Sequence, residues 1–591
     1  MVYSALPTNC AQGIFIAPDL NICKIGENTL IKYFLQNKKK LITYLLLSPA
    51  MSITSVLFAS ALEPLVNSAT QKDVAVMLRA IMAFGLIVVA DLTASFFHKI
   101  SRENLRKEFL VGFKNDLFAG IMSKSFQEYR KEPPSYYVSM MQRDVKKVST
   151  DYFDSVCGIY RVSISFMVTV LALIRVNPLI CLINVVIALL SVLIPKVFER
   201  KLRSNSQDAS KSASEYQSVI SDAFIGFNTI KLYSVISKIR RQVQDRNEKS
   251  EEAECNLLKT NYKVSYMSVI CTSAGFALTI IASVVFVFLG KISIGGVLAL
   301  SQLIGGILAP FQDVPIFITN LKSIAVVIDK LKKYIEIDEQ DLEESAHSIT
   351  DYSLSIENAM VSFDDKKVLD GVNITFDQGK KYVIMGESGC GKSTLVKLFI
   401  KMSECAGGRV LLGKRDIKNI PDKDLYNVVN YMQQEVFLFD DSIRNNISLY
   451  KDYSPEKIQY AIECAGLKDY VESLEYGLET KINGNGYNLS GGEKQRIGIA
   501  RALLAGAKVF IFDEITSNLD VATEHLVENL IMNLKDVTVI MITHRINDAT
   551  LSKADEILVM KDGNIKEKGS FKELLDTRGM LYGYKMIAST V

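Results

Sequence analysis

One segment combines glycines, a lysine and two hydroxyl residues at the spacing GxxxxGK[ST]. It lies between two apolar stretches and consists of Gly386, Glu387, Ser388, Gly389, Cys390, Gly391, Lys392, Ser393 and Thr394. Glycines let backbone N–H groups curl around phosphate oxygens, and the N-terminus of a following helix favours negative charge. In this motif Lys392 reaches the β and γ phosphates, and the Ser393 hydroxyl helps to hold Mg²⁺. The sequence therefore predicts a nucleotide-binding loop.

Two further apolar stretches end in side chains that could act on such a nucleotide. Asp513 and Glu514 follow the first, and His544 follows the second. Asp513 fits a carboxylate linked to Mg²⁺, and Glu514 is placed to activate water as a general base. An ion-paired strand end is the alternative for the carboxylates, and a histidine after a strand is more often structural. From about residue 353 short apolar strands alternate with helices, which indicates a parallel-sheet α/β domain.

The first half of the chain is different in character. A helix needs about 20 mostly apolar residues to cross a membrane. Six segments of the 591-residue chain meet this need: 41–65, 75–98, 155–174, 177–197, 264–290 and 293–321. A buried core helix is the alternative for any single one, especially for the segments that contain Asp91 and Arg161. Six in series indicate an integral membrane domain.

Basic residues are concentrated in two of the connections between these segments. Residues 99–147 and 196–263 are rich in Lys and Arg, whereas the other connections carry only Lys72, Arg175 and Lys291. By the positive-inside rule, both termini and the two long connections are cytoplasmic, in a multi-pass protein of the plasma membrane. Connections this long are expected to be helices that extend the spans and turn back near 132–135 and 224–228. The near balance of 68 basic and 65 acidic residues argues against a nucleic-acid partner.

A third motif distinguishes the kind of nucleotide-binding domain. Residues 489–496 have the sequence LSGGEKQR, and 499–502 the sequence IARA. Together with the P-loop and the carboxylates, they resemble the signature motif of ABC transporter ATPases. The six preceding spans resemble the exporter class of this family. The resemblance implies an α-helical membrane domain plus an α/β P-loop ATPase, which exports a substrate by alternating access at the expense of ATP.

The resemblance also implies an assembly of two chains and a role for several residues. Two ATP molecules would lie between the P-loop of one chain and Ser490, Gly491 and Gly492 of the other. Gln434 resembles the Q-loop glutamine, which touches Mg²⁺ and water and relays the nucleotide state to the membrane helices. His544 resembles the switch histidine, and 517–520 resemble the D-loop. The breaks near 126–136 and 222–232 would be coupling helices that dock on the ATPase domains.

Three positions depart from the family pattern. The aromatic residue that stacks on adenine is replaced by Asp365, so Phe363, the nearest aromatic residue, is expected to substitute for it. An acidic residue before the signature is replaced by Asn483-Gly484, and the usual signature glutamine by Glu493. None of these changes removes a catalytic group, so hydrolysis is expected at two equivalent sites of a homodimer, or with a related half-transporter as the partner.

These patterns divide the chain into four parts. We expect an N-terminal extension at 1–27, a membrane domain at 28–321, a charged linker at 322–352 and the ATPase domain at 353–591. Residues 28–37 are expected to form an amphipathic helix on the inner membrane surface. The 30 or so residues before the first span are too few for the cysteine peptidase domain of some peptide exporters. Nine cysteines without a CxxC pair argue against a disulfide framework or a zinc site.

Three functions of different classes compete. A non-transport ABC ATPase would lack the six spans, and a nucleotide-gated channel or regulator would be expected to lose catalytic groups such as Glu514. An ATP-driven exporter is therefore favoured. Its substrate could be a peptide, an amphipathic drug or a lipid. The chain is similar to bacteriocin-type exporters without their peptidase domain, and this similarity favours a peptide.

Overall fold

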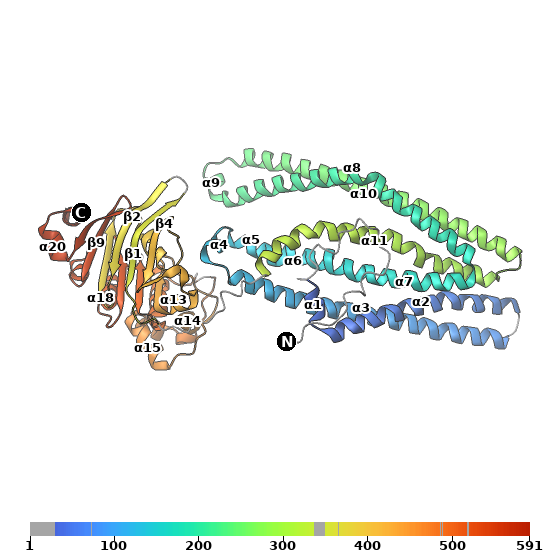
Figure 1. Cartoon of the computed structure of the whole chain (residues 1–591), viewed down its shortest axis with the longest axis horizontal. Helices are drawn as coiled ribbons and strands as arrows, with labels where there is room; N and C mark the ends of the chain where they lie inside the picture. Colours follow the sequence, from blue (N-terminus) through green and yellow to red (C-terminus); the bar gives the residue numbers. More distant parts are fainter. Residues whose placement is uncertain are drawn as a thin grey trace. The chain divides into compact units, whose positions relative to one another are not determined.

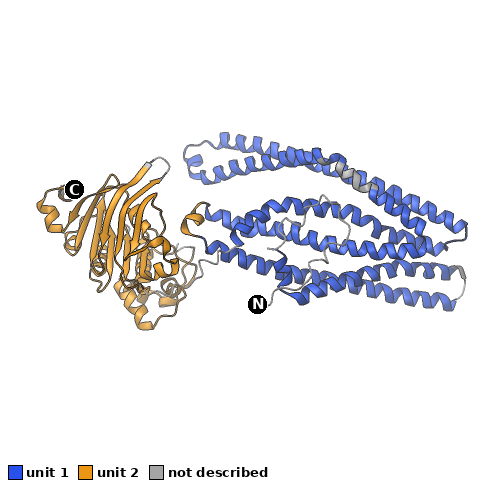
Figure 2. Ribbon diagram, in the orientation of Figure 1, with its two compact units in different colours: residues 1–124, 132–337 blue, residues 125–131, 338–591 orange. Residues whose placement is uncertain are grey.

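The computed structural model describes residues 30–71, 74–335, 349–363, 366–484, 486, 488–516, 519 and 521–590. They fall into two compact units (Figure 2). Unit 1 comprises residues up to 124 together with 132–337, and unit 2 comprises 125–131 and 338–591. Residues 1–29, which include the N-terminal extension, and 336–348 lie outside the described residues.

Unit 1 is a bundle of long helices (Figure 1). Its helices are α1 (Ile31–Leu35), α2 (Lys38–Gln71), α3 (Val74–Met122), α5 (Pro134–Ser139), α6 (Val145–Lys147), α7 (Asp154–Val176), α8 (Pro178–Ile225), α9 (Phe227–Leu232), α10 (Ile236–Phe288) and α11 (Ile294–Ile335). Two π-helical turns, η2 (Met140–Asp144) and η3 (Val148–Phe153), flank α6. Helices α3, α8 and α10 have 49, 48 and 53 residues. Each is about twice as long as a membrane span requires.

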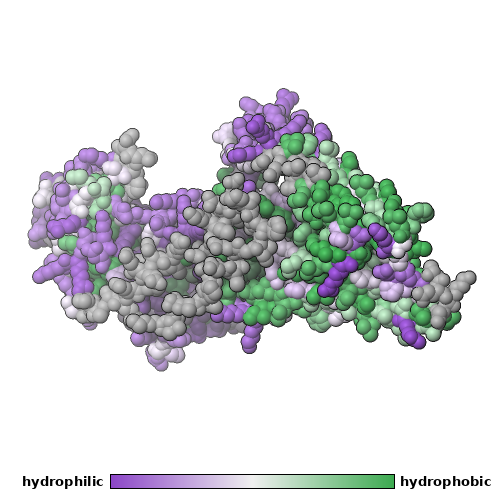
Figure 3. Space-filling model, turned by 45° about the vertical axis from the view of Figure 1, so that its right-hand side comes forward, coloured by the Kyte–Doolittle hydropathy of each residue, from purple (hydrophilic) through white to green (hydrophobic). Residues whose placement is uncertain are grey.

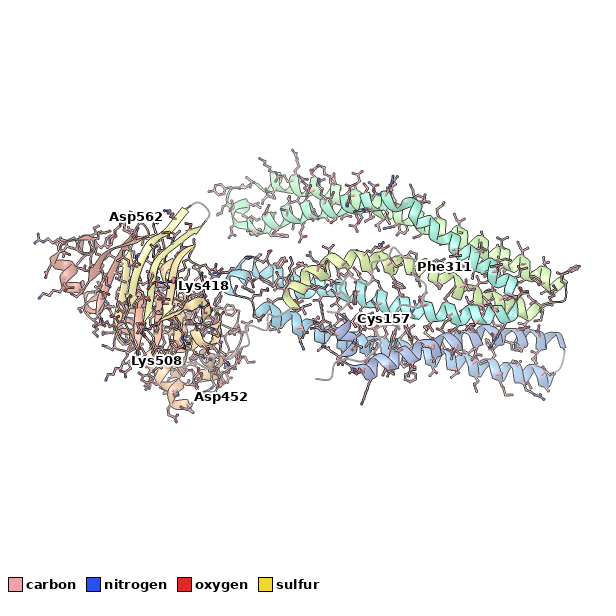
Figure 4. All side chains as sticks on the ribbon, viewed as in Figure 1. Cys157, Phe311, Lys418, Asp452, Lys508 and Asp562 are labelled. Carbon is pink, nitrogen blue, oxygen red and sulfur yellow. The ribbon has the colours of Figure 1, made fainter. Side chains whose placement is uncertain are left out.

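Five described helical segments are long and apolar enough to cross a membrane. They contain the predicted first, second, third, fifth and sixth spans. The predicted fourth span begins α8, where Pro178–Leu189 is apolar but shorter. Figure 3 shows the apolar side chains gathered on the surface of this unit. Inside the bundle, the rings of Phe166 and Phe311 pack edge-on at 5.7 Å and join α7 to α11 (Figure 4).

The two predicted turns in the long connections are present. In the first, α3 ends at Met122 and a short helix, α4 (Phe126–Arg130), precedes α5. In the second, α8 ends at Ile225 and α9 follows Gly226 directly, so that α8 and α10 run side by side (Figure 1). The charged stretch after the sixth span starts as helix, because α11 continues to Ile335. The boundary that we place at 321/322 therefore falls inside α11.

Unit 2 contains two sheets. The strands are β1 (Leu354–Phe363), β2 (Lys366–Phe376), β3 (Lys381–Gly386), β4 (Gly407–Leu412), β5 (Arg415–Asp416), β6 (Val429–Met432), β7 (Val509–Asp513), β8 (Thr538–Ile542), β9 (Glu556–Lys561) and β10 (Asn564–Gly569). One sheet has the order β10-β9-β3-β8-β7-β6, parallel except for β10. The other is antiparallel, in the order β2-β1-β4-β5.

Helices surround these sheets and complete unit 2. Besides α4 they are α12 (Lys392–Leu398), α13 (Asp422–Val428), α14 (Ile443–Ser448), α15 (Pro455–Cys464), α16 (Lys468–Ser473), α17 (Gly491–Leu504), α18 (Val521–Met532), α19 (Asp548–Leu551), α20 (Phe571–Asp576) and α21 (Met580–Thr590), with 3₁₀ turns η5 (Ile417–Asn419) and η6 (Gly477–Glu479). Side chains of β3 alternate between two apolar cores: Val383 and Met385 enter one, Tyr382 and Ile384 the other. Burial on both faces fixes β3, and with it the loop that follows.

Candidate active site

The loop from β3 to α12 depends on its glycines. Gly386, Gly389 and Gly391 have φ angles of 148°, 80° and 104°, a region that other residues rarely adopt. A Cβ atom on Gly386 would lie 2.3 Å from the Met560 carbonyl oxygen, and one on Gly391 would lie 2.9 Å from that of Val368. Only glycine fits these two places, so the loop can present its backbone N–H groups around an anion.

Lys392 is held beneath this loop. Its side chain is buried, and Nζ donates to the carbonyl oxygens of Gly386 at 2.9 Å and Glu387 at 2.8 Å. Burial lowers the pKa of Lys392, while the nearby Cys390, Glu514 and Asp513 act in the opposite direction. A phosphate could replace the two carbonyl oxygens and would satisfy the ammonium group better, because it carries charge.

Asp513 lies at the end of β7, where two hydroxyl groups hold its carboxylate. Ser393 Oγ donates to Oδ1 at 2.9 Å, and the Tyr431 hydroxyl donates to Oδ2 at 2.8 Å. Oxygen ligands of this kind suit Mg²⁺. Ser393 and Asp513 could therefore hold Mg²⁺ next to a phosphate.

Glu514 and His544 lie next to each other at the ends of neighbouring strands. Glu514 Oε1 is 2.6 Å from His544 Nε2. Glu514 has a φ angle of 53°, and its backbone N–H donates to the carbonyl oxygen of Ile542 at 3.2 Å. A positive φ is unfavourable for a residue with a side chain and is common at functional sites. The turn aims the carboxylate at the cavity beside the P-loop instead of continuing the strand.

These groups line one cavity of about 450 Å³. Its described lining consists of Val368, Ser388, Gly389, Gly391, Lys392, Ser393, Thr394, Lys397, Tyr431, Gln433, Gln434, Glu435, Asp513, Glu514 and His544. The structure therefore brings together most of the predicted P-loop residues, Gln434, both carboxylates and the histidine. Cys390 is buried behind the loop, with Sγ 4.0 Å from Lys392 Nζ. Gly386 lines an adjacent hollow of about 460 Å³.

The predicted signature residues are absent from the described lining of this cavity. Ser490 caps the N-terminus of α17: its Oγ accepts from the Glu493 N–H, and the Glu493 carboxylate accepts from the Ser490 N–H at 2.8 Å. Glutamate and glutamine can both form this capping box, so the glutamate at position 493 keeps a cap that a glutamine could also make. The side chain of Phe363 and residues 517, 518 and 520 lie outside the described residues.

Sequence reasoning missed Tyr431, although it lines the cavity. A signal was present, because Tyr431 lies near the carboxyl end of a strand. In the parallel ladder of β6 and β7 it is opposite Ile511, two residues before Asp513. Parallel strands direct their carboxyl ends toward the same edge, where α/β sheets bind ligands.

Two family models match different parts of the chain. The model described as the ABC transporter transmembrane region matches residues 41–311, and the model described as ABC transporter matches 369–517. The second match contains the P-loop, the signature and both carboxylates. The chain belongs to the ABC transporters. It is an exporter half-transporter, with a membrane domain fused to an ATP-binding domain, and it is a multi-pass membrane protein.

Several curated proteins are similar to this half-transporter. A putative multidrug export ATP-binding/permease protein of Bacillus subtilis is 26% identical over 86% of this chain and 89% of its own length. An ATP-dependent lipid A-core flippase of Francisella tularensis is 28% identical over 94% of both chains. The pediocin PA-1 transport/processing ATP-binding protein of Pediococcus acidilactici is 30% identical over 68% of this chain but only 56% of its own length. This chain thus spans about half of the pediocin protein.

A solved structure supports the fold. A bacterial Atm1-family ABC exporter with ATP bound superposes with a TM-score of 0.80, over 93% of this chain and 98% of that one, at 19% identity. The predicted fold class, a long helical membrane domain plus an α/β ABC ATPase, is confirmed. The chain is an ABC ATPase coupled to transport and binds ATP through its ABC domain. Half-transporters of this kind typically dimerise.

Proposed function

We propose that two copies of this half-transporter export a peptide from the cytoplasm, with ATP hydrolysed between their ATPase domains. The arrangement of Glu514, Lys392 and Asp513 around one cavity carries this proposal. Lys392 binds the β and γ phosphates, and Glu514 accepts a proton from the attacking water. His544 orients Glu514 and lines the same cavity.

The metal ligands in this proposal are Ser393, Asp513 and Gln434. The first two are already within hydrogen-bonding distance of each other, and Gln434 lines the same cavity. Mg²⁺ bound there would neutralise charge that develops on the β and γ phosphate oxygens. The protein contributes by holding these ligands and by excluding most of the surrounding water.

A second copy would complete each site. Ser490, Gly491 and Gly492 do not line the cavity of their own chain among the residues described. They form the N-terminal end of a 14-residue helix, whose free N–H groups and dipole suit a phosphate. On α9 and its flanks, Phe224, Ile225, Leu232 and Tyr233 are at least three-quarters exposed. We expect a partner domain to cover these exposed apolar side chains. Their exposure supports the predicted role of α9 as a coupling helix.

The other predicted coupling helix is α4. It clusters with unit 2, where the ring of Phe126 packs against Tyr426 at 5.9 Å. The ATPase domain is therefore expected on the same side of the membrane as α4 and α9. The basic residues of both long connections support a cytoplasmic location for that side.

Polar residues on α11 support a polar substrate. Gln302, Gln312 and Thr319 are exposed along this apolar helix, and Asp313 follows Gln312. Asp313 is 3.9 Å from Arg161 of α7, and both side chains remain more than one-third exposed. Polar and charged groups are unfavourable against lipid, so this face is expected to line the substrate pathway. Amides, a hydroxyl and two opposite charges match a peptide better than an apolar drug.

A lipid is the second candidate substrate. The lipid A-core flippase resembles the chain over 94% of both lengths, whereas the pediocin protein covers less. A panel of peptides, amphipathic drugs and lipids, added to the reconstituted protein, separates the candidates. We expect peptides to stimulate ATP hydrolysis most. If only lipids stimulated hydrolysis, the proposed substrate would be a lipid and not a peptide.

Exchanging the two charges tests the pathway. Arg161→Asp and Asp313→Arg should each raise the peptide concentration for half-maximal stimulation about tenfold, as expected when one charged hydrogen bond is lost. The double exchange restores an ion pair but reverses its direction. We expect it to keep the basal ATPase rate and still fail to restore the peptide response. A double variant that responds like the wild type would show that the pair only joins α7 to α11.

Cys390 offers a test of the loop. Because the thiol is only 8% exposed, maleimide should inhibit ATP hydrolysis slowly, as the loop opens. ATP should slow this inhibition by ordering the loop over the thiol. The matched control is Cys390→Ala, since exposed Cys255 also reacts. Equal sensitivity of this variant would place the inhibitory reaction at another cysteine.

A further inference from the structure

Tyr431 lies in the cavity outside the P-loop and has no part in the roles proposed above. It lies on β6 in a parallel ladder with β7, so its position relative to Asp513 is fixed by backbone hydrogen bonds. The phenol reaches over the strand end to Asp513 Oδ2 at 2.8 Å. Its partner on the same carboxylate is Ser393, at Oδ1.

The phenol can only donate in this contact. The Tyr431 hydroxyl carries the proton of this contact, and the carboxylate of Asp513 offers only acceptor oxygens. A hydrogen bond to a charged group in a partly buried place is stronger than one between neutral groups.

The two hydroxyl groups differ in what happens when a metal binds. Ser393 is itself a predicted metal ligand, so its oxygen would contact the metal as well as Asp513, whereas Tyr431 would contact only the carboxylate. Tyr431 is anchored on a strand and can keep its hydrogen bond. Oδ2 of Asp513 would then stay fixed by Tyr431, and Oδ1 would be the oxygen available to a metal site.

We propose that Tyr431 is a positioning residue, which orients the carboxylate of Asp513 for Mg²⁺ binding. This inference rests on the proposed function, because it takes Asp513 and Ser393 as the metal site. Groups that orient metal ligands in this way commonly change metal affinity by about 10–100-fold. Tyr431 would thus set the Mg²⁺ requirement of the enzyme without touching the nucleotide.

The test is Tyr431→Phe in the full-length, purified half-transporter. Phenylalanine keeps the ring and removes only the hydroxyl. The probe is Mn²⁺, whose binding together with a non-hydrolysable ATP analogue is followed by electron paramagnetic resonance. Affinity for the analogue alone is measured in EDTA. The matched control is Tyr426→Phe, whose hydroxyl donates to the carbonyl oxygen of Ile400 and not to Asp513.

We expect Tyr431→Phe to weaken Mn²⁺ binding about 10–100-fold and to leave analogue binding in EDTA unchanged. Tyr426→Phe should match the wild type in both. Unchanged Mn²⁺ affinity, or an equal loss with and without metal, would overturn the positioning role. If the wild type itself bound no Mn²⁺ with the analogue, the proposed metal site would be wrong. This result differs from the ones that overturn only the positioning role of Tyr431.

Discussion

Glu514→Gln is expected to lower the rate of ATP hydrolysis by about 10²–10⁴-fold, the usual contribution of a general base. Glutamine has the same shape and can still bond to His544, so the turn after β7 should persist. ATP binding should therefore survive, and the variant should accumulate as an ATP-bound closed dimer. The measurement is steady-state hydrolysis together with the amount of nucleotide retained by the purified protein.

The control for this variant is Glu475→Gln, an exposed glutamate outside the described cavity lining. It should hydrolyse ATP at the wild-type rate. Hydrolysis by Glu514→Gln near that rate would show that another group activates the water, and the assignment of the base would be wrong.

Lys392→Ala and Gly492→Asp are each expected to abolish ATP hydrolysis in a homodimer, for different reasons. The first removes the charge that we propose binds the β and γ phosphates. The second adds a side chain and a negative charge where the signature would approach the γ-phosphate of the partner. Loss of one charged hydrogen bond alone corresponds to about a tenfold or larger loss of affinity.

Mixed dimers of these two variants should recover activity. One site then combines both defects, while the other pairs an intact P-loop with an intact signature. If the sites act independently, hydrolysis should return to about half of the wild-type rate. Lys414→Ala, an exposed lysine away from the cavity, is the control for loss of charge. Mixed dimers as inactive as either parent would contradict a site shared between chains or show that both sites must work together.

The local features of the ATPase could be predicted because each has one physical cause. The glycine spacing predicts the loop, since Gly386 and Gly391 have conformations and contacts that exclude a Cβ atom. The apolar stretches before Asp513 and His544 predict buried parallel strands. The breaks near 132–135 and 224–228 predict turns, and α4 and α9 lie next to them.

Other features depend on contacts between distant residues. The antiparallel sheet β2-β1-β4-β5 joins strands about 40 residues apart, and no local period indicates such pairing. The charged run within 322–352 predicts a linker, but α11 continues to Ile335 because Ile328, Leu331 and Ile335 remain buried along one face. The contact of Tyr431 with Asp513 likewise exists only after β6 and β7 pair.

The hydrogen bonds of Asp91 distinguish between two possible roles of this residue. Within the second predicted span, its carboxylate could contact a substrate or bond to a neighbouring helix. Oδ1 accepts from Thr54 Oγ1 and Ser55 Oγ of α2, both at 2.9 Å. The structural alternative therefore accounts for Asp91. His98, on the same helix, is hydrogen-bonded to Ser48 of α2 at 3.0 Å.

We propose that this half-transporter couples ATP hydrolysis to export of a peptide. Uptake of labelled peptide into proteoliposomes measures this coupling, with ATP added outside so that it drives only chains whose ATPase domain faces outward. We predict ATP-dependent accumulation by the wild type and none by Glu514→Gln, although the variant still binds ATP. Equal accumulation by both, or hydrolysis by the wild type without any uptake, would contradict the claim.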